Sequence, residues 1–295
     1  MFIMYALLSF FFWGIADLFY KKGNSGEGKY NHIKTGIIVG IVMGIHATIY
    51  LIINQVQISI LDVIKYLPVS AFYISSMVIG YKGLKFIELS ISSPIQNSSG
   101  IITTLLLLII FREKLHPLAY IAIAMIFAGI IMVTIVETKD TREERRIMLK
   151  KKGVFLVILF PIIYCILDGL GTFIDSLYLD KFEIISEDVA LVTYEYTFLI
   201  YAIISWIICK FKNEKITIKN DKFKWCAALF ETAGQFTYVF AMAGDSTISA
   251  AIVGSYCVLA FLLGGIVLKE KLSTNQYIGI TINLLGIILL SALNL

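Results

Sequence analysis

Apolar residues dominate this chain in long runs that are separated by short polar stretches. A helix that crosses a bilayer needs about 20 mostly apolar residues, and ten runs meet this requirement. We therefore predict an all-α polytopic membrane protein with ten transmembrane helices. The predicted segments are 2–20, 33–54, 66–84, 92–111, 117–136, 154–177, 188–209, 225–243, 247–267 and 275–294.

Prolines help to define these predicted helices. Pro68, Pro94 and Pro117 fall in the first turns of the third, fourth and fifth segments, where proline removes no hydrogen bond. Pro161 lies inside the sixth segment and is expected to kink it. Residues 1–5 form no basic leader and no small-residue cleavage site follows the first apolar run, so we expect that run to be retained as a helix.

Two stretches of the chain, 93–131 and 250–288, are near-copies. Each holds an apolar helix with small and polar residues, a charged tetrapeptide and a second apolar helix. The tetrapeptides are Arg-Glu-Lys-Leu at 112–115 and Lys-Glu-Lys-Leu at 269–272, which places them 157 residues apart. The same offset pairs Gly129 with Gly286. A helix–turn–helix that returns at a fixed offset indicates internal duplication.

The duplication divides the chain into two halves of five predicted helices. We predict a first repeat over residues 1–136, a charged cytoplasmic linker over 137–152 and a second repeat over 153–295. Because five is an odd number, the second copy enters the membrane from the opposite side. The two halves are therefore expected to form inverted repeats about a pseudo-two-fold axis in the membrane plane.

Charge distribution predicts the orientation of the chain. Of its 25 basic residues, 21 lie in or directly beside the odd-numbered connections between predicted helices. The positive-inside rule places these connections in the cytoplasm and both termini outside. Among 295 residues, 58% are hydrophobic and 16% are charged, whereas soluble domains carry about a quarter charged residues. We expect an integral, multi-pass cell-membrane protein that is surrounded by lipid and binds no nucleic acid.

Several ionisable side chains fall deep inside the predicted membrane helices, where such groups are costly and usually functional. Asp168 and Glu195 lie near the middle of their segments, Glu231 lies a third of the way along its own, and Asp17 lies near the end of the first. Helical spacing places them in polar or aromatic stripes. The stripes are Phe10/Trp13/Asp17/Tyr20, Ser93/Asn97/Gly100/Thr104, Pro161/Tyr164/Asp168/Thr172/Asp175 and Glu231/Gln235/Tyr238/Met242.

If these stripes converge, they enclose a cavity rich in carboxylates and aromatic rings. Such a cavity suits a small organic cation, since acids supply charge and rings supply cation–π contact. A carboxylate in a low-dielectric environment also holds a proton more readily than one in water. The predicted substrate contacts are Trp13, Asn97, Tyr164, Asp168, Tyr194, Glu195, Glu231, Gln235 and Tyr238. The candidates for proton coupling are Asp17, Asp168, Glu195 and Glu231.

Each ionisable group also has a structural interpretation. The three central acids could hydrogen-bond to Thr, Ser or Tyr on neighbouring helices and serve packing alone. Asp17 could form an interfacial ion pair with Lys21. Asp175 and Asp188 lie near predicted helix ends and are expected to be solvated, and His46 is expected to be a packing residue.

The sequence contains no pattern typical of catalysis. Its three histidines lie far apart, and HExxH, GxSxG and Walker-type motifs are absent from the sequence. The four cysteines lie in apolar runs of the second half and form no CxxC pair. We therefore expect no enzyme activity, no metal site and no cofactor.

The residues resemble a known family. The Trp13-Gly14 pair in the first helix and the two copies of Arg/Lys-Glu-Lys-Leu, each after a helix with a small, Ser-rich start, are similar to the drug/metabolite transporter superfamily, specifically its ten-helix EamA family. The resemblance covers nearly the whole chain. It implies a secondary transporter that alternates access by rocking bundles around a central cavity, and it assigns no residue a role in substrate choice.

Three functions remain open at this point. The favoured hypothesis is secondary active transport of a small organic cation or amino-acid-like compound, coupled to protons. The alternative is an exporter of neutral or zwitterionic amino acids or drugs whose acids serve proton coupling only. A membrane binding protein without transport is the third. Because two five-helix halves can close a cavity by themselves, we expect a monomer.

Overall fold

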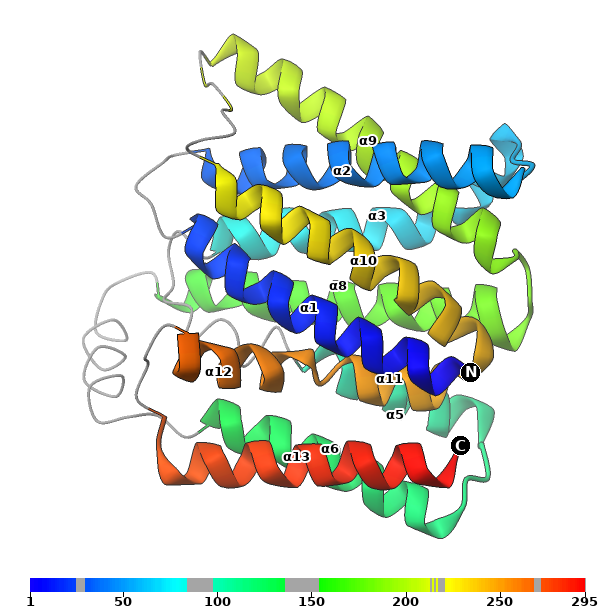
Figure 1. Ribbon diagram of the computed structural model, residues 1–295, viewed down its shortest axis with the longest axis vertical. Helices are drawn as coiled ribbons and strands as arrows, with labels where there is room; N and C mark the ends of the chain where they lie inside the picture. Colours follow the sequence, from blue (N-terminus) through cyan, green and yellow to red (C-terminus); the bar gives the residue numbers. More distant parts are fainter. Residues whose placement is uncertain are drawn as a thin grey trace.

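The computed structural model describes residues 1–24, 30–83, 98–135, 154–212, 214, 216, 221–267 and 272–294. Every regular element in this part of the chain is helical. The elements are α1 (Phe2–Asn24), α2 (Asn31–Asn54), α3 (Ile60–Gly83), α5 (Ser99–Phe111), α6 (Pro117–Ile135), α8 (Val154–Ser176), the π-helix η1 (Leu177–Lys181), α9 (Glu187–Phe211), α10 (Lys222–Gly244), α11 (Ser246–Val253), α12 (Tyr256–Val267) and α13 (Thr274–Leu293). The helices lie side by side, and both termini lie at the same end of the bundle (Figure 1).

The apolar segments predicted from the sequence all overlap these helices. Among the described residues, seven helices are long and apolar enough to cross a membrane: Phe2–Gly23, Asn31–Asn54, Ile60–Gly80, Leu159–Lys181, Glu187–Phe211, Ser246–Val267 and Thr274–Leu293. Two shorter apolar helices are Ser99–Phe111 and Pro117–Val133. The prediction of an all-helical, multi-pass membrane protein is confirmed, whereas ten crossings stay a prediction. The predicted linker 137–152 lies outside the described residues.

The third helix begins earlier than predicted. The Asp62 carboxylate accepts a hydrogen bond from the Ser59 backbone N–H at 3.0 Å, and the Asp62 N–H donates to Ser59 Oγ at 3.3 Å. This reciprocal capping starts the helix before the apolar run that marked its predicted start. Pro68 therefore lies inside α3 and not in its first turn. Pro117 is the first residue of α6 and Pro161 lies inside α8, as predicted, whereas Pro94 falls outside the described residues.

The predicted ninth helix is divided into α11 and α12 at a turn that contains Gly254. Gly254 faces Gly100 of α5 so closely that a Cβ on either residue would lie 2.7 Å from the Cα of the other. Glycine on both sides therefore permits contact between the two backbones. Asp245 begins α11, because its side chain accepts a hydrogen bond from the Ile248 N–H at 2.9 Å.

Three contacts between a helix of the first half and a helix of the second have counterparts in which the two halves exchange roles. The pair α1–α10 corresponds to α8–α3, α1–α12 corresponds to α8–α5, and α2–α10 corresponds to α9–α3. The pairs α2–α9 and α6–α13 join equivalent helices of the two halves. This reciprocity is what an inverted repeat would produce, and the division at residues 136 and 153 stays a prediction.

The contact between α6 and α13 shows the reciprocity at the level of residues. A Cβ on Gly129 would meet Asn283 and the Gly279 carbonyl, while a Cβ on Gly286 would meet Ile126 and the carbonyl of Ala122. Gly129 and Gly286 are 157 residues apart, and so are their neighbours Ile126 and Asn283. The Asn283 amide also donates to the Ile126 carbonyl at 3.0 Å. The offset found in the sequence is thus repeated in the packing.

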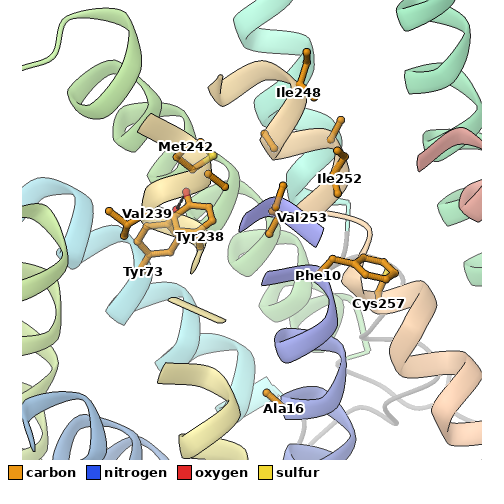
Figure 2. Packing of buried hydrophobic residues seen from close by; sticks show 14 of the residues in the cluster. Phe10, Ala16, Tyr73, Tyr238, Val239, Met242, Ile248, Ile252, Val253 and Cys257 are labelled. Carbon is orange, nitrogen blue, oxygen red and sulfur yellow. Dashed lines mark hydrogen bonds between the residues drawn. The ribbon is translucent and has the colours of Figure 1, made fainter. Parts of the chain in front are cut away.

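Apolar side chains cover both the inside and the outside of the bundle. Inside, α1, α3, α10, α11 and α12 contribute to one packed cluster (Figure 2). Outside, large apolar residues are exposed along several helices, including Ile203, Ile204 and Trp206 of α9. A continuous apolar exterior on a helical bundle indicates contact with lipid.

Glycines on α2 determine how closely it approaches α9, and they offer a test of this packing. A Cβ at Gly40 would lie 2.2 Å from the backbone carbonyl oxygen of Phe198, whereas a Cβ at Gly44 would meet the flexible Leu199 side chain at 2.7 Å. We expect Gly40→Ala to lower the midpoint of thermal unfolding in detergent by several degrees and Gly44→Ala to lower it less. Equal midpoints for the two variants would contradict this backbone contact between α2 and α9.

Candidate functional site

Helices α1 and α10 are in close contact, and this brings Trp13 beside Glu231. The Trp13 Nε1–H donates to the backbone carbonyl of Glu231 at 3.3 Å, and the Ser9 hydroxyl donates to the carbonyl of Gly234 at 3.1 Å. A Cβ at Gly234 would lie 2.3 Å from the Trp13 ring. The missing side chain of this glycine therefore lets the indole enter the space between the helices.

The corresponding pair, α8 and α3, is joined by polar contacts. The polar stripe predicted on the sixth helix faces α3, where Tyr73 donates to the Thr172 hydroxyl at 2.9 Å. Ser76 donates to Asp168 Oδ1 at 3.5 Å, and Ser99 of α5 also interacts with this carboxylate. These contacts fix Asp168 on the inner side of α8.

Three of the predicted carboxylates are brought together by α1, α8 and α10. Glu231 lies within electrostatic range of both Asp168 and Asp17. All three side chains lie deep among protein atoms, yet each keeps part of its surface accessible. The three acids are therefore partly accessible neighbours on α1, α8 and α10. We call Asp17, Asp168 and Glu231 the acid cluster.

Aromatic rings surround the acid cluster. The Trp13 ring packs against Tyr238 with centroids 5.0 Å apart and against Tyr256 at 5.8 Å. Tyr256 lies within electrostatic range of all three acids, and Tyr194 lies within range of Asp168 and Glu231. The Tyr73 and Tyr238 side chains meet between α3 and α10 (Figure 2). Acids and aromatic rings thus lie close together inside the bundle.

Few positive charges lie near the acid cluster. Lys21, one turn after Asp17 on α1, acts on the Asp17 carboxylate. In the part of the chain that the structure describes, no basic side chain interacts electrostatically with Asp168 or Glu231. Other described lysines pair elsewhere, for example Lys181 with Glu113 at 2.6 Å. The negative charge of the cluster is therefore largely unmatched by described side chains.

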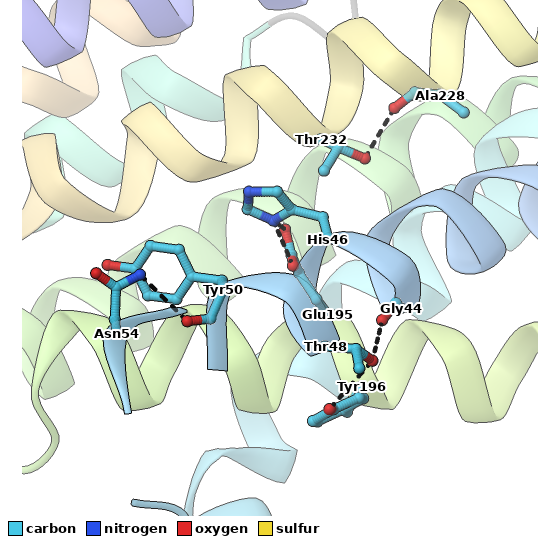
Figure 3. Close-up of polar contacts among 9 residues, drawn as sticks. All are labelled: Gly44, His46, Thr48, Tyr50, Asn54, Glu195, Tyr196, Ala228 and Thr232. Carbon is cyan, nitrogen blue, oxygen red and sulfur yellow. Dashed lines mark hydrogen bonds and ion pairs between the residues drawn. The ribbon is translucent and has the colours of Figure 1, made fainter. Parts of the chain in front are cut away.

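Glu195 belongs to a different contact. It is fully buried, and its carboxylate oxygens lie 2.8 and 2.9 Å from the Nδ1 atom of His46 on α2 (Figure 3). The His46 ring packs edge-on against Phe236 of α10 at 5.8 Å. The ionisable group that interacts with Glu195 is His46, and not a member of the acid cluster. His46 is thus the partner of a predicted functional acid, where the sequence predicted only a packing residue.

The remaining predicted residues differ in position. Tyr194 and Tyr238 are buried among the rings described above. Gln235 is 2% exposed, and its Nε2 atom has no hydrogen-bond partner among the described residues. Tyr164 is half-buried one turn before Asp168. Asn97 lies outside the described residues.

Of the two aspartates that were expected to be solvated, Asp175 is not, and Asp188 is only partly exposed. Asp175 is fully buried and accepts a hydrogen bond from the Tyr66 hydroxyl at 2.5 Å. Asp188 is half-buried and accepts one from Tyr50, also at 2.5 Å. The expectation for Asp175 was wrong because the helical path does not end near 177 but continues through η1 to Lys181. The polar stripe itself, which includes Asp175, was the available signal.

The His46–Glu195 pair can be tested by its effect on stability. Removing His46 leaves a buried carboxylate without its partner, so we expect His46→Ala to destabilise the protein by about 1–3 kcal/mol at neutral pH. Glu195→Gln added to this variant should recover most of the loss, because the amide carries no charge. Thermal unfolding in detergent measures both effects, and the exposed His116 supplies the control His116→Ala. An undiminished loss in the double variant would show that the pair is not its source.

Comparison with known proteins agrees with this architecture. A sequence model of the EamA-like transporter family matches residues 1–135 and 151–292. A solved structure described only as "Crystal structure of protein" has a TM-score of 0.71, with 13% identity, over 98% of this chain and 96% of that chain. At this identity the likeness shows the fold alone. No curated protein matches the chain. Because the family match covers most of its length, the chain belongs to the EamA-like transporter family of the drug/metabolite transporter superfamily, a family of multi-pass membrane transporters.

Proposed function

We propose that this protein is a secondary active transporter that carries a small organic cation through the centre of its helical bundle. The observation that carries the proposal is the acid cluster. Three partly accessible carboxylates from three helices lie near one another, and Lys21 is the one described basic side chain that interacts electrostatically with any of them. Unpaired buried carboxylates are unfavourable. A cationic substrate supplies the missing positive charge.

The rings around the cluster narrow the substrate class. Trp13, Tyr238 and Tyr256 present π faces and edges close to the acids. A cation over an aromatic face gains about 0.5–2 kcal/mol, and more when it is desolvated. Alkylated or delocalised cations benefit most, because they are weakly hydrated and can use both charge and ring contact. We therefore favour amines and quaternary ammonium compounds over inorganic cations.

The proposed mechanism is alternating access by two inverted five-helix repeats that cross the membrane ten times. It is supported by the reciprocal helix contacts and by the matching neighbours of Gly129 and Gly286. Repeats related in this way can exchange conformations, so that the site faces either side of the membrane in turn. Proton coupling, cytoplasmic odd-numbered connections and a monomeric state are parts of the same proposal.

A zwitterionic substrate is the second candidate. Gln235 lies one turn before Tyr238, and its buried Nε2 atom has no described partner. An amide donor near three acids could bind the carboxylate of a compound whose ammonium group faces the acids. In that case the acids would serve the ammonium group or a coupled proton, and the rings would contribute less.

The proposal can be tested with purified protein in liposomes. Uptake of radiolabelled tetraethylammonium, a zwitterionic amino acid and a neutral metabolite is compared in wild type, Asp168→Asn and Glu231→Gln. We expect saturable tetraethylammonium uptake in wild type that is weakened by about tenfold or more in either variant, which corresponds to at least ~1.4 kcal/mol. Glu183→Gln, which changes an exposed carboxylate in the same way, is the matched control.

The outcomes separate the candidates. Wild-type uptake by both acid-cluster variants would overturn the carboxylate mechanism. Uptake of the zwitterion alone would support the second candidate, with Gln235→Leu then expected to abolish it. Saturable binding without flux of any compound would indicate a membrane binding protein in place of a transporter.

A further inference from the structure

Asp175 occupies an enclosed polar site next to the acid cluster. Its side chain is fully buried, Oδ1 accepts a hydrogen bond from Tyr66, and Oδ2 has no hydrogen-bond partner among the described residues. An ionised carboxylate that is buried without a cation costs several kcal/mol, and in practice such a group becomes neutral. The protonation state of Asp175 therefore depends on whether a positive charge lies near it.

The groups that face Asp175 are phenols. Tyr66 and Tyr73 approach it from α3, Tyr194 from α9 and Tyr238 from α10, while Tyr178 packs against Tyr66. Asp168, two turns earlier on α8, adds negative charge. Lys181, six residues further along, is paired with Glu113 and Asp180 at 2.6 and 2.7 Å. In the described part of the chain, no basic side chain acts on Asp175.

The direction of the neighbouring hydrogen bonds can be determined by counting protons. The Thr172 hydroxyl donates its proton to the backbone carbonyl of Asp168 at 3.0 Å, so it accepts the proton of Tyr73 at 2.9 Å. Tyr73 has then used its proton, and its 2.8 Å contact with Tyr238 requires Tyr238 to donate. Each phenol carries one proton. Tyr238 therefore donates its single proton to Tyr73.

Because of this hydrogen bond, Asp175 receives no proton from Tyr238. The Tyr238 hydroxyl also lies against the Asp175 carboxyl, but with its proton on Tyr73 it can offer only its oxygen. An ionised carboxylate would place two acceptors in contact. A proton on Asp175 removes the negative charge from this contact, and Oδ2, which has no hydrogen-bond partner among the described residues, can carry it while Oδ1 still accepts from Tyr66.

The hydroxyl chain links Asp175 to the proposed substrate site. Hydrogen bonds run from Tyr238 through Tyr73 and Thr172 to the backbone of Asp168, and Tyr238 lies near the Asp175 carboxyl and packs on the Trp13 ring. Loss of the Asp175 proton would draw the Tyr238 proton away from Tyr73 and toward the new carboxylate. The hydrogen bonds of two lining residues would then rearrange, so protonation and substrate binding would influence each other.

From this arrangement we propose that Asp175 is the site that binds the coupling proton. The proton binds as an O–H bond on Oδ2 and leaves as the same proton, so no other reactant is needed. The substrate is held separately by the acid cluster. The coupling role of this proton rests on the proposed transport function. The protonation of Asp175, by contrast, can be measured without any substrate.

The first experiment is infrared difference spectroscopy of the purified protein between neutral and alkaline pH. A protonated carboxylic acid has a carbonyl stretch that a carboxylate lacks. We expect wild type to show this band at neutral pH and to lose it as the pH rises, and Asp175→Asn to lack the same component. Asp188→Asn, which also removes a tyrosine-bound aspartate, should retain it and is the matched control. An unchanged band in Asp175→Asn would overturn the proposal.

A second variant keeps the test decisive if Asp175→Asn folds poorly. Tyr66→Phe retains the carboxyl group but removes the donor to Oδ1, so the Asp175 band should shift to higher frequency, as a carbonyl does when it loses a hydrogen bond. The band should stay in place in Tyr50→Phe, which removes the equivalent donor from Asp188. An unshifted band in Tyr66→Phe would show that the titrating acid is not Asp175.

The second experiment tests coupling in liposomes with radiolabelled tetraethylammonium. We expect Asp175→Asn to keep exchange of labelled for unlabelled compound and to lose accumulation driven by a pH gradient. Accumulation equal to that of wild type, or dependence on a sodium gradient in place of the pH gradient, would overturn the proposal. If wild type moves no tetraethylammonium, the proposed function fails, while the infrared result still decides whether Asp175 binds a proton.

Discussion

The energetic cost of charge inside an apolar bundle governs this structure. In hydrocarbon, backbone polar groups must be satisfied within the chain, which leaves helices as the available element here. Side-chain charges face the same constraint, and the protein meets it in two ways. At the ends of helices, lysines pair directly with acids, as Lys224 does with Asp221 at 2.6 Å. In the interior, acids lie near one another or accept hydrogen bonds from phenols.

Small residues make this interior possible. Gly234 admits the Trp13 ring, and Gly100 and Gly254 allow α5 to touch the turn between α11 and α12. These positions bring helices from opposite halves close enough for side chains of α1, α8 and α10 to share one site. Local packing by residues without side chains therefore determines where the charged residues meet.

The fold could be predicted from the sequence to a greater extent than the site. Hydropathy located the described helices approximately, because each predicted apolar run overlaps at least one of them. It placed the start of α3 too late, since the capping contact between Ser59 and Asp62 is a local hydrogen bond that hydropathy does not register. Hydropathy also does not predict contacts between residues that are far apart in the sequence. His46 and Glu195 are 149 positions apart, and their contact depends on how α2 crosses α9.

The case of Asp175 shows why helical periodicity alone was insufficient. Spacing placed it on the same face as Asp168 and Thr172, and the structure has all three on the side toward α3 or the phenols beside it. Depth, however, depends on where the helix ends, and the π-helical extension through Lys181 carries Asp175 away from the end. A one-dimensional pattern reports direction around a helix axis but not distance from a membrane surface.

The repeat appears in the packing, whereas two acids of the acid cluster have no acidic counterpart. At the offset of 157, Asp168 corresponds to Phe11 and Glu231 to Ile74, and at an offset of 158 they correspond to Phe10 and Tyr73. Under alternating access, the two helical repeats need equivalent packing because the protein must reach two related conformations. The substrate and the proton need one set of charges each, provided that both conformations can expose them. A second set would add unpaired acids to the interior at a cost in stability. Duplication of the helical repeat, with divergence of the acids inside it, satisfies both requirements.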